Sequence, residues 1–510
     1  MFNKIKSGTC YNLQGIIINI EVDITKGLPS FYIVGLPDTS VRESRERVRS
    51  AIINSGYEYP LGRITVSLAP ADIKKIGSLL DLPIALAILI KTKQICNRNL
   101  DDHLIFGELC LNGDIKGIRG ALPIILQGKE EGIKNFIFPY ENINECINDN
   151  MINYYPFSNL KQVTSYINFN DSLPWEYKEE KEELEEYLDF SNIIGQDSSK
   201  RALLISACGS HNIFLYGSTG CGKTMLANAF PSILPPLTIE EEKEVTKIYS
   251  ISGLMPPSGR IKRPFRSPHH TITTNALAGG GYKVKFGEVT LANKGVLFLD
   301  EILEFSKEAL EILREPLEEK TIRINRLQGS YVALADFILI GAYNICPCGK
   351  GDINEIYSEN GCNCTEIEKR KYNNRLSKAI KDRIDLFNYV PKVRFEEISK
   401  YRKSDEYTSE KMKEVVIRTR QIQKDRLKGT GYEYNSQIRG KDIFELCSIS
   451  KNAIRILESY FNNASPSLRA YGKVIKIART ISDIANKKDI REIDVIEAIN
   501  YRKDNYGKII

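Results

Sequence analysis

The stretch IFLYGSTGCGKTMLANAF, residues 213–230, decides how the second part of this chain folds. Its first four residues predict a short buried strand, and residues 225–230 predict a helix. The loop between them fits the phosphate-binding pattern G-x-x-x-x-G-K-[ST] at every position. Glycines let backbone N–H groups curl around phosphates, and the following helix points its positive end at them. The predicted nucleotide-binding residues are Gly217, Ser218, Thr219, Gly220, Cys221, Gly222, Lys223 and Thr224.

Two side chains of this loop have separate predicted roles. Lys223 is expected to reach the β- and γ-phosphates of ATP, and the hydroxyl of Thr224 is expected to bind Mg²⁺. The alternative is a chance match in a glycine-rich turn. The position of the loop between a predicted strand and a predicted helix favours the nucleotide site.

A second apolar strand, residues 295–299, ends in two carboxylates, Asp300 and Glu301. Buried parallel strands present their ligand-binding groups at their C-terminal ends. Asp300 is predicted to hold magnesium, directly or through water, and Glu301 to polarise the attacking water as a general base. An acidic helix start after a core strand has the same local sequence. The phosphate loop 77 residues upstream (300 minus 223) favours the catalytic interpretation.

A third apolar strand, residues 337–342, is followed by Tyr343 and Asn344. An asparagine there is suited to orient the lytic water beside the γ-phosphate. A simple turn residue at a strand end has the same local sequence. The two interpretations stay open at this point.

Two arginines complete the set of candidate catalytic residues. Arg383 lies in the motif DRIDL, residues 382–386, and Arg469 precedes a long predicted helix. Each is able to neutralise charge on the γ-phosphoryl group, one of them from a neighbouring subunit. Taken alone, each also has the pattern of a surface salt-bridge residue.

Four of the eleven cysteines occur in two C-x-C pairs, Cys346 with Cys348 and Cys362 with Cys364, with 13 residues between the pairs. Four thiolates in a reducing compartment form a tetrahedral zinc site. The spacing departs from the commoner C-x-x-C, so a free-thiol loop or a redox pair is the alternative. Because the protein supplies all four ligands, the predicted zinc is structural and has no open position for catalysis.

Composition places the chain among ordinary globular proteins. At 510 residues it is too long for one hydrophobic core, and about two to four domains are expected. Lys and Arg exceed Asp and Glu by six (71 against 65), which permits a nucleic-acid partner without arguing for one. The longest apolar run, residues 82–90, is too short to span a membrane and predicts a buried core segment. The N-terminus is a poor signal peptide, so we expect a cytoplasmic protein with reduced thiols.

Changes of pattern along the sequence predict an α/β protein with four parts. Residues 1–168 read as a mixed α/β domain, and residues 169–188 as an acidic, exposed linker. Residues 189–393 alternate strand, glycine-rich loop, helix and strand, which predicts a P-loop domain with a parallel sheet and a four-cysteine insert at 346–364. Residues 394–510 are rich in segments with the helical period and predict a helical lid.

Short motifs extend over nearly the whole chain. The first domain contains VGLPD at 34–38, ESRERVRSA at 43–51 and DLPIA at 81–85. The middle contains GQ at 195–196, GKTMLA at 222–227, PFRSPHH at 264–270, GGG at 279–281 and FLDE at 298–301. The last part contains CPCG at 346–349, DRIDL at 382–386 and ARTI at 478–481. In this order they resemble the YifB/ComM family, the magnesium-chelatase-related AAA+ ATPases.

The resemblance implies a hexamer with Mg-ATP at its subunit interfaces. Arg383 would be the trans-acting arginine finger and Arg469 the lid sensor, and inserts in the motor would project into a central pore. Family members with known roles are similar to helicases that drive branch migration of DNA during natural transformation. Two positions depart from the family pattern, Asn293 in place of His and Phe286 in place of Pro. Neither touches the core ATPase groups.

Three further motifs lie in the first domain: GE at 107–108, GIRG at 117–120 and GIK at 132–134. They resemble the proteolytic domain of Lon, which has a ribosomal S5 domain 2-like fold. That protease uses a serine nucleophile activated by a lysine.

The corresponding positions of this chain are occupied by Leu79 and Leu122. Ser78 lies one place off and has no evident lysine partner, although Lys74 and Lys75 are close in sequence. We therefore expect a non-catalytic domain that serves docking or assembly.

The leading functional hypothesis is an ATP-driven DNA helicase or translocase. Basic stretches at 260–266 and 369–383 would meet phosphates inside a ring, although such stretches also occur as solvated surface or subunit interface. The alternative is a metal-chelatase-like or protein-remodelling ATPase without DNA activity. The histidine pair His269 and His270 is expected to be structural, because no neighbouring sequence supplies further metal ligands.

Overall fold

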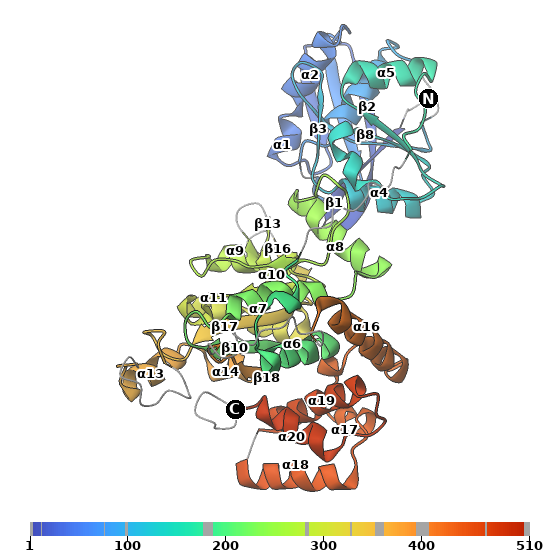
Figure 1. Cartoon of the computed structure of the whole chain (residues 1–510). Helices are drawn as coiled ribbons and strands as arrows, with labels where there is room; N and C mark the ends of the chain where they lie inside the picture. Colours follow the sequence, from blue (N-terminus) through green and yellow to red (C-terminus); the bar gives the residue numbers. More distant parts are fainter. Residues whose placement is uncertain are drawn as a thin grey trace. The chain divides into compact units, whose positions relative to one another are not determined.

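The computed structural model describes residues 4–11, 13–75, 77–96, 100–176, 187–280, 285–326, 329–351, 362–393, 407–464 and 467–503 (Figure 1). The chain divides into two compact units. The first contains Met1–Glu182 and Ile239–Ile261, and the second contains Glu183–Thr238 and Lys262–Ile510. Among the described residues, no helix is long and apolar enough to cross a membrane. Parts of three predicted segments, at 177–186, 352–361 and 394–406, lie outside the described residues.

The first unit is built on a seven-stranded mixed sheet in the order β3-β4-β2-β1-β5-β8-β9. Strand β2 pairs antiparallel with β1 and β4, whereas β3–β4, β1–β5, β5–β8 and β8–β9 are parallel pairs. The strands are β1 (Lys4–Tyr11), β2 (Gln14–Thr25), β3 (Ser30–Val34), β4 (Arg63–Ala69), β5 (His103–Ile105), β8 (Asn135–Pro139) and β9 (Asn153–Phe157), with a small separate pair β6 (Glu108–Leu109) and β7 (Ile115–Lys116). The helices are α1 (Thr39–Arg42), α2 (Ser44–Asn54), α3 (Asp81–Lys91), α4 (Ala121–Glu130), η1 (Tyr140–Glu145), α5 (Leu160–Phe169) and α8 (Ile239–Ser252).

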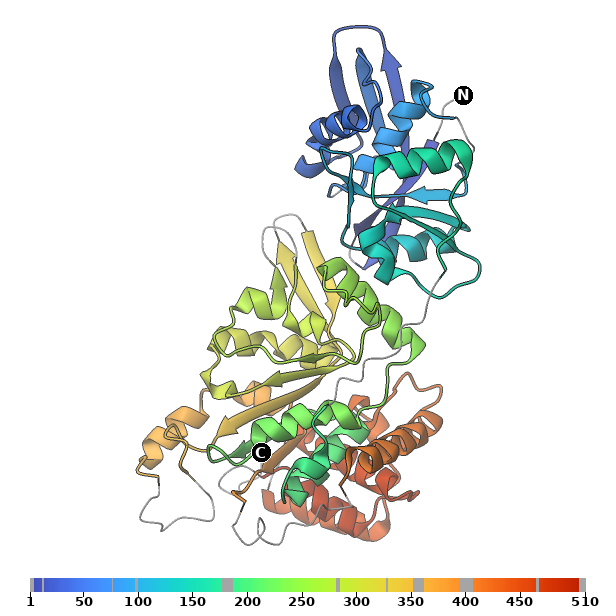
Figure 2. The ribbon, with the colours of Figure 1, turned by 45° about the horizontal axis from the view of Figure 1, so that its top comes forward.

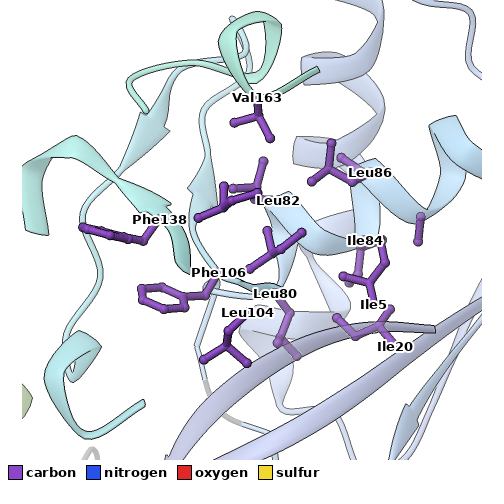
Figure 3. Packing of buried hydrophobic residues seen from close by; sticks show 14 of the residues in the cluster. Ile5, Ile20, Leu80, Leu82, Ile84, Leu86, Leu104, Phe106, Phe138 and Val163 are labelled. Atoms are coloured by element: carbon purple, nitrogen blue, oxygen red, sulfur yellow. The ribbon is translucent and has the colours of Figure 1, made fainter. Parts of the chain in front are cut away.

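Helix α3 forms the centre of the first core, as the apolar run at 82–90 predicted. Every residue from Asp81 to Ile90 is buried. Figure 3 shows its side chains among those of β1, β2 and β5. Pro83 lies in the first turn of the helix, where a missing N–H costs no intrahelical hydrogen bond. The run is therefore a single uninterrupted helix.

A segment of the predicted ATPase region, Ile239–Ile261, packs with the first unit. The buried carboxylate of Glu145 accepts hydrogen bonds from the hydroxyl of Ser250 and from the backbone N–H of Leu122, the latter at 2.9 Å. The N–H of Gly120 donates to the carbonyl of Ser250 at 3.1 Å. Burial raises the pKa of Glu145. The chain thus leaves the second unit after the phosphate-loop helix and returns to it at residue 262.

The second unit contains a five-stranded, fully parallel sheet in the order β11-β14-β17-β10-β18. This confirms the predicted α/β class with a parallel sheet and helices. Helices α16 and α19 pack against α6 (Figure 2). The sheet strands are β11 (Phe265–Arg266), β14 (Val296–Leu299), β17 (Ile338–Asn344), β10 (Ile213–Gly217) and β18 (Leu386–Tyr389).

Shorter elements surround this sheet. The helical ones are η2 (Phe190–Asn192), α6 (Asp197–Gly209), α7 (Lys223–Ala229), η3 (Phe230–Ile233), α9 (Thr274–Ala278), α10 (Glu288–Leu291), η4 (Ile302–Glu304), α11 (Lys307–Ile312), α12 (Arg314–Glu319), α13 (Glu366–Asn373) and α14 (Lys378–Lys381). Two antiparallel pairs are β12 (Gly279–Gly280) with β13 (Lys285–Phe286), and β15 (Thr321–Arg326) with β16 (Gly329–Leu334).

The C-terminal part is helical, as its periodicity predicted. In α19 the buried residues Ala470, Val474, Ile477 and Ile481 recur at the spacing of one helix face. That face joins the hydrophobic core beneath the parallel sheet. The helices are α16 (Ser409–Arg426), η5 (Asn435–Gln437), α17 (Asp442–Leu446), α18 (Lys451–Ala464), α19 (Leu468–Ile484) and α20 (Glu492–Asn500).

Candidate nucleotide site

The predicted phosphate loop connects the end of β10 to the start of α7. Gly220 and Gly222 have φ angles of +78° and +96°, a left-handed conformation that glycine adopts without a steric penalty. Gly222 is the N-cap of α7. The loop therefore turns at its glycines and leads directly into a helix N-terminus, where backbone N–H groups lack partners within the helix.

Lys223 is buried inside this loop. Its ammonium group donates to the carbonyl oxygens of Gly217 at 3.2 Å and Ser218 at 2.8 Å, and to the side-chain oxygen of Asn344 at 3.1 Å. An ammonium group has three N–H donors, so these three acceptors satisfy it. A phosphate that entered the loop would replace neutral acceptors with charged oxygens, which form stronger hydrogen bonds.

The acidic strand end lies against the phosphate-loop helix. The hydroxyl of Thr224 donates to Oδ2 of Asp300 at 2.8 Å, and the backbone N–H of Glu301 donates to Oδ1 of Asp300 at 3.0 Å. Glu301 has a φ of +49°, which is uncommon for a residue with a side chain and concentrates at functional sites. A hydroxyl and a carboxylate at this separation are oxygen donors of the kind that Mg²⁺ binds.

Asn344 joins these groups through the register of the sheet. Strand β17 lies between β10 and β14, and Gly217 and Asn344 are direct partners in the β10–β17 pairing. Asn344 therefore ends its strand beside the phosphate loop and contacts Lys223. Of the two interpretations of this residue, a plain turn residue and a site residue, the contact with Lys223 favours the second.

Two further residues of the site were not predicted from the sequence. Nδ1 of His270 lies 3.5 Å from Oε2 of Glu301, and its ring packs on that of His269 with centroids 4.1 Å apart. The side-chain amide of Gln196 donates to the carbonyls of Cys221 at 3.2 Å and Pro391 at 2.6 Å. His270 lies in the motif PFRSPHH and Gln196 in the motif GQ, both noted above. Their presence in these motifs was the sequence signal that could have assigned them to the site.

The structure brings Arg383 and Arg469 together at Glu318. Both donate to the carboxylate of Glu318, Arg383 to Oε2 and Arg469 to Oε1, the latter at 3.0 Å. Among the described residues, neither arginine forms a hydrogen bond with residues 217–224, Asp300 or Glu301.

The four paired cysteines converge. Their sulfur atoms all lie within 4.8 Å of one another, and Sγ of Cys348 lies 3.3 Å from that of Cys346 and 3.4 Å from that of Cys362. A tetrahedral zinc with bonds of about 2.3 Å spaces its sulfur ligands by about 3.8 Å. The donor set and its spacing therefore fit a zinc ion.

The cysteine loop also contacts the phosphate loop. The carbonyl of Gly349 accepts a hydrogen bond from the backbone N–H of Thr219 at 2.8 Å. A Cβ added at Gly349 would lie 2.1 Å from the hydroxyl oxygen of Thr219, and the φ of Gly349 is +73°. Residues 346–349 thus support the phosphate loop from the end of β17.

A phosphate loop on β10, an acidic pair on β14 and a polar residue on the strand between them define a P-loop protein of the AAA+ class. Comparison with known proteins agrees. The family described as magnesium chelatase, subunit ChlI matches residues 189–398, its C-terminal family matches 406–502, and the family described as subunit ChlI of Mg-chelatase matches 20–142.

Individual relatives cover nearly the whole chain. The uncharacterized protein YifB of Salmonella typhimurium is 37% identical over 95% of this chain and 94% of its own length. The competence protein ComM of Haemophilus influenzae is 36% identical over 96% of this chain and 95% of its own length. The magnesium-chelatase 67 kDa subunit of Chlorobaculum parvum is 28% identical over 30% of this chain and 23% of its own length. The chain belongs to the YifB/ComM family of magnesium-chelatase-related AAA+ proteins.

Proposed function

We propose that this chain hydrolyses Mg-ATP. The observation that carries the proposal is the convergence of Lys223, Asn344, Thr224, Asp300 and Glu301 from three adjacent parallel strands and one helix. These are the group types that phosphoryl transfer needs: a cation for the phosphates, oxygen ligands for magnesium and a carboxylate for the attacking water.

Each residue has a defined task in this proposal. Lys223 exchanges its carbonyl partners for phosphate oxygens, and Asn344 orients the attacking water. Thr224 and Asp300 hold Mg²⁺, which neutralises charge on the β- and γ-phosphates. Glu301 accepts a hydrogen bond from the attacking water and, as a general base, increases the nucleophilicity of that water.

We further propose that the active form is a hexameric ring, as the family resemblance implies. Arg383 then serves as the arginine finger for the nucleotide of a neighbouring subunit, and Arg469 serves as the lid sensor. The position of both arginines at Glu318, with no bond to their own phosphate loop among the described residues, supports action on another subunit.

The four cysteines are proposed to hold a structural zinc ion. Their separations support it, and zinc would fix the loop that supports Thr219. Native mass spectrometry of wild type and of the variant Cys362→Ser/Cys364→Ser tests the site. One zinc per wild-type chain and none in the variant is expected, and equal metal content would remove the proposal.

The work done with ATP is proposed to be translocation on DNA, as a helicase or branch-migration motor. Similarity to the competence protein ComM extends over both chains almost completely. The match to the individual magnesium-chelatase 67 kDa subunit covers 30% of this chain, although the chelatase family models match residues 20–142, 189–398 and 406–502. The full-length match to a competence protein is what supports the DNA motor over a metal-chelatase-like or protein-remodelling role.

The first domain is proposed to be a non-catalytic, Lon-protease-like docking domain. Leu79 and Leu122, at the positions where that protease carries its catalytic pair, are buried apolar side chains. The hydroxyl of Ser78 donates to the carboxylate of Glu108, and the ammonium group of Lys75 donates to a backbone carbonyl. The Ser78 hydroxyl is therefore directed to a carboxylate and not to a lysine, unlike the serine of the Lon Ser–Lys pair.

A branched-DNA assay tests the motor. Purified protein with Mg-ATP is expected to resolve a labelled branched DNA, and Glu301→Gln is expected to bind that DNA without resolving it. Wild-type protein that hydrolyses ATP but neither binds nor moves DNA would contradict the DNA motor. A chelatase partner that stimulates hydrolysis, with no response to DNA, would support the alternative.

A further inference from the structure

Three arginines from different parts of the second unit meet at Glu318, near the C-terminal end of α12. The Glu318 carboxylate accepts from Arg383 through Oε2 and from Arg469 through Oε1, and the Glu318 backbone carbonyl accepts from Arg439. We call these four residues the Glu318 cluster. It joins α12 to the end of α14, to the loop before α17 and to the first turn of α19.

The cluster carries three positive charges around one negative charge. Burial opposes the ionisation of Glu318, but the hydrogen bond from Arg383 and the charges of Arg469 and Arg439 hold its pKa below 4.5. The carboxylate is therefore ionised at neutral pH. Without it, guanidinium groups held near one another would repel, and the geometry of the pair would be lost.

The two arginines differ in how firmly the rest of the chain holds them. The side chain of Arg383 is 13% exposed, and its Nε and Nη1 donate to the carbonyls of Arg314 at 3.1 Å and Ala379 at 2.8 Å. Arg469 is 60% exposed, and Glu318 is its hydrogen-bond acceptor among the described residues. Glu318 is therefore the group that fixes Arg469 relative to Arg383.

We propose that Glu318 is a positioning residue for ATP hydrolysis, which aligns Arg383 and Arg469 so that their free N–H groups face the nucleotide of a neighbouring subunit. The inference rests on the proposed function of the two arginines. Glu318 itself touches no reacting atom.

The variant Glu318→Gln tests this role, because it keeps the size of the side chain and removes its charge. We expect kcat for ATP hydrolysis to fall roughly 10- to 100-fold through misplaced arginines. The KM for ATP and the affinity for a fluorescent ATP analogue stay within about twofold, because the phosphate loop is untouched. Glu319→Gln is the matched control: Glu319 is an exposed neighbour and is expected to keep wild-type activity.

Mixed oligomers separate positioning from a folding defect. A Lys223→Ala subunit lacks its own nucleotide site but carries an intact Glu318 cluster. Lys223→Ala and Glu318→Gln subunits are mixed in equal amounts. About one interface in four then pairs a working phosphate loop with a working Glu318 cluster. The mixture is therefore expected to recover roughly a quarter of the wild-type rate of ATP hydrolysis. The triple variant Glu318→Gln/Arg383→Ala/Arg469→Ala is expected to be no slower than Arg383→Ala/Arg469→Ala, because both groups that Glu318 positions are then absent.

The outcomes separate this inference from the proposed function. A wild-type kcat in Glu318→Gln, failure of the mixture to recover activity, or a further loss from Glu318→Gln in the Arg383→Ala/Arg469→Ala background would each overturn the positioning role. Wild-type protein without ATPase activity, or Lys223→Ala with full activity, would overturn the proposed function and this inference together.

Discussion

Replacing Asp385 by asparagine is expected to destabilise the second unit by disconnecting the parallel sheet from helix α19. Asp385 is 4% exposed and precedes β18. Its carboxylate contacts Nζ of Lys473 in α19 at 2.8 Å and accepts from the N–H of Asn212, before β10, at 3.2 Å. Nδ1 of His211 lies 3.3 Å from the same carboxylate. One side chain thus links β10, which carries the phosphate loop, to the neighbouring strand β18 and to helix α19.

The magnitude follows from the charge left behind. Burial lowers the pKa of Lys473 to about 7, so at about pH 5 its ammonium group is charged. In Asp385→Asn this group, whose side chain is 10% exposed, loses its counter-ion. Breaking a buried ion pair by removing one partner costs about 3–5 kcal/mol. Adding Lys473→Met to this variant removes the unpaired charge and is expected to recover most of the lost stability.

Urea unfolding followed by two signals measures the effect. Far-UV circular dichroism reports both units, whereas the single tryptophan, Trp175, packs on the core of the first unit. The dichroism transition of Asp385→Asn should move to lower urea, and the tryptophan transition should stay. Asp382→Asn is the control, because the Asp382 carboxylate forms no hydrogen bond within the described part of the chain, and its effect should stay within about 0.5 kcal/mol.

The same pair predicts a pH dependence with a defined sign. Burial opposes the ionisation of Asp385, but Lys473 and His211 hold its pKa well below the usual value of 3.8. Since the folded pKa is the lower one, the stabilisation is present above pH 3.8 and is lost as the pH falls through the folded pKa. The difference between wild type and Asp385→Asn should be full at about pH 5 and shrink below pH 3.8. A variant as stable as wild type at neutral pH would refute this reasoning.

Three more predictions concern the nucleotide site. Gly349→Ala places a methyl group against Thr219 at a positive φ and should weaken ATP binding about tenfold or more, measured with a fluorescent ATP analogue. His270→Ala removes the group beside Glu301, the proposed general base, and should lower kcat roughly tenfold with little change in ATP affinity. Removing the proposed zinc from the cysteine site, by chelation or by serine at Cys362 and Cys364, should weaken ATP binding, because the same loop supports the phosphate loop.

Each of these predictions has a matched control. Gly429→Ala has the same left-handed backbone without a neighbour within 4 Å, and its ATP affinity should equal that of wild type. His269→Ala is the control for His270→Ala. It removes the other ring of the histidine pair but leaves the contact between His270 and Glu301, so kcat should stay close to that of wild type. Cys96→Ser is the control for the serine variants of the cysteine site, because it alters an exposed cysteine of the first unit. ATP affinity or kcat that changes as much in a control as in its test variant would contradict the corresponding prediction.

The parts of the site that depend on local sequence were predictable. The strand, loop and helix around Gly217, the acidic strand end at Asp300 and the strand leading to Asn344 all appear where their patterns placed them. Each of these sequence patterns spans about ten residues, because a buried strand and the polar group at its end are adjacent in the chain. The convergence of the cysteines was also predictable, since short C-x-C pairs read as ligand pairs.

The contacts between distant segments were not predictable. Glu318 and Arg469 are 151 residues apart, and nothing near either residue specifies the other. The contact of His270 with Glu301 depends on the pairing of β11 with β14, which the sequence does not encode locally. Segment Ile239–Ile261 was assigned by position to the ATPase region, but its packing is set by buried partners such as Glu145 in the first unit.

The central claim is that the groups around Lys223 and Glu301 form one site that hydrolyses ATP. Single-turnover hydrolysis by wild type and Glu301→Gln, with the bound ATP measured in the same samples, tests it most directly. Glu301→Gln is expected to bind ATP as wild type does and to hydrolyse it roughly 10²–10⁴-fold more slowly. Hydrolysis by Glu301→Gln at the wild-type rate would contradict it.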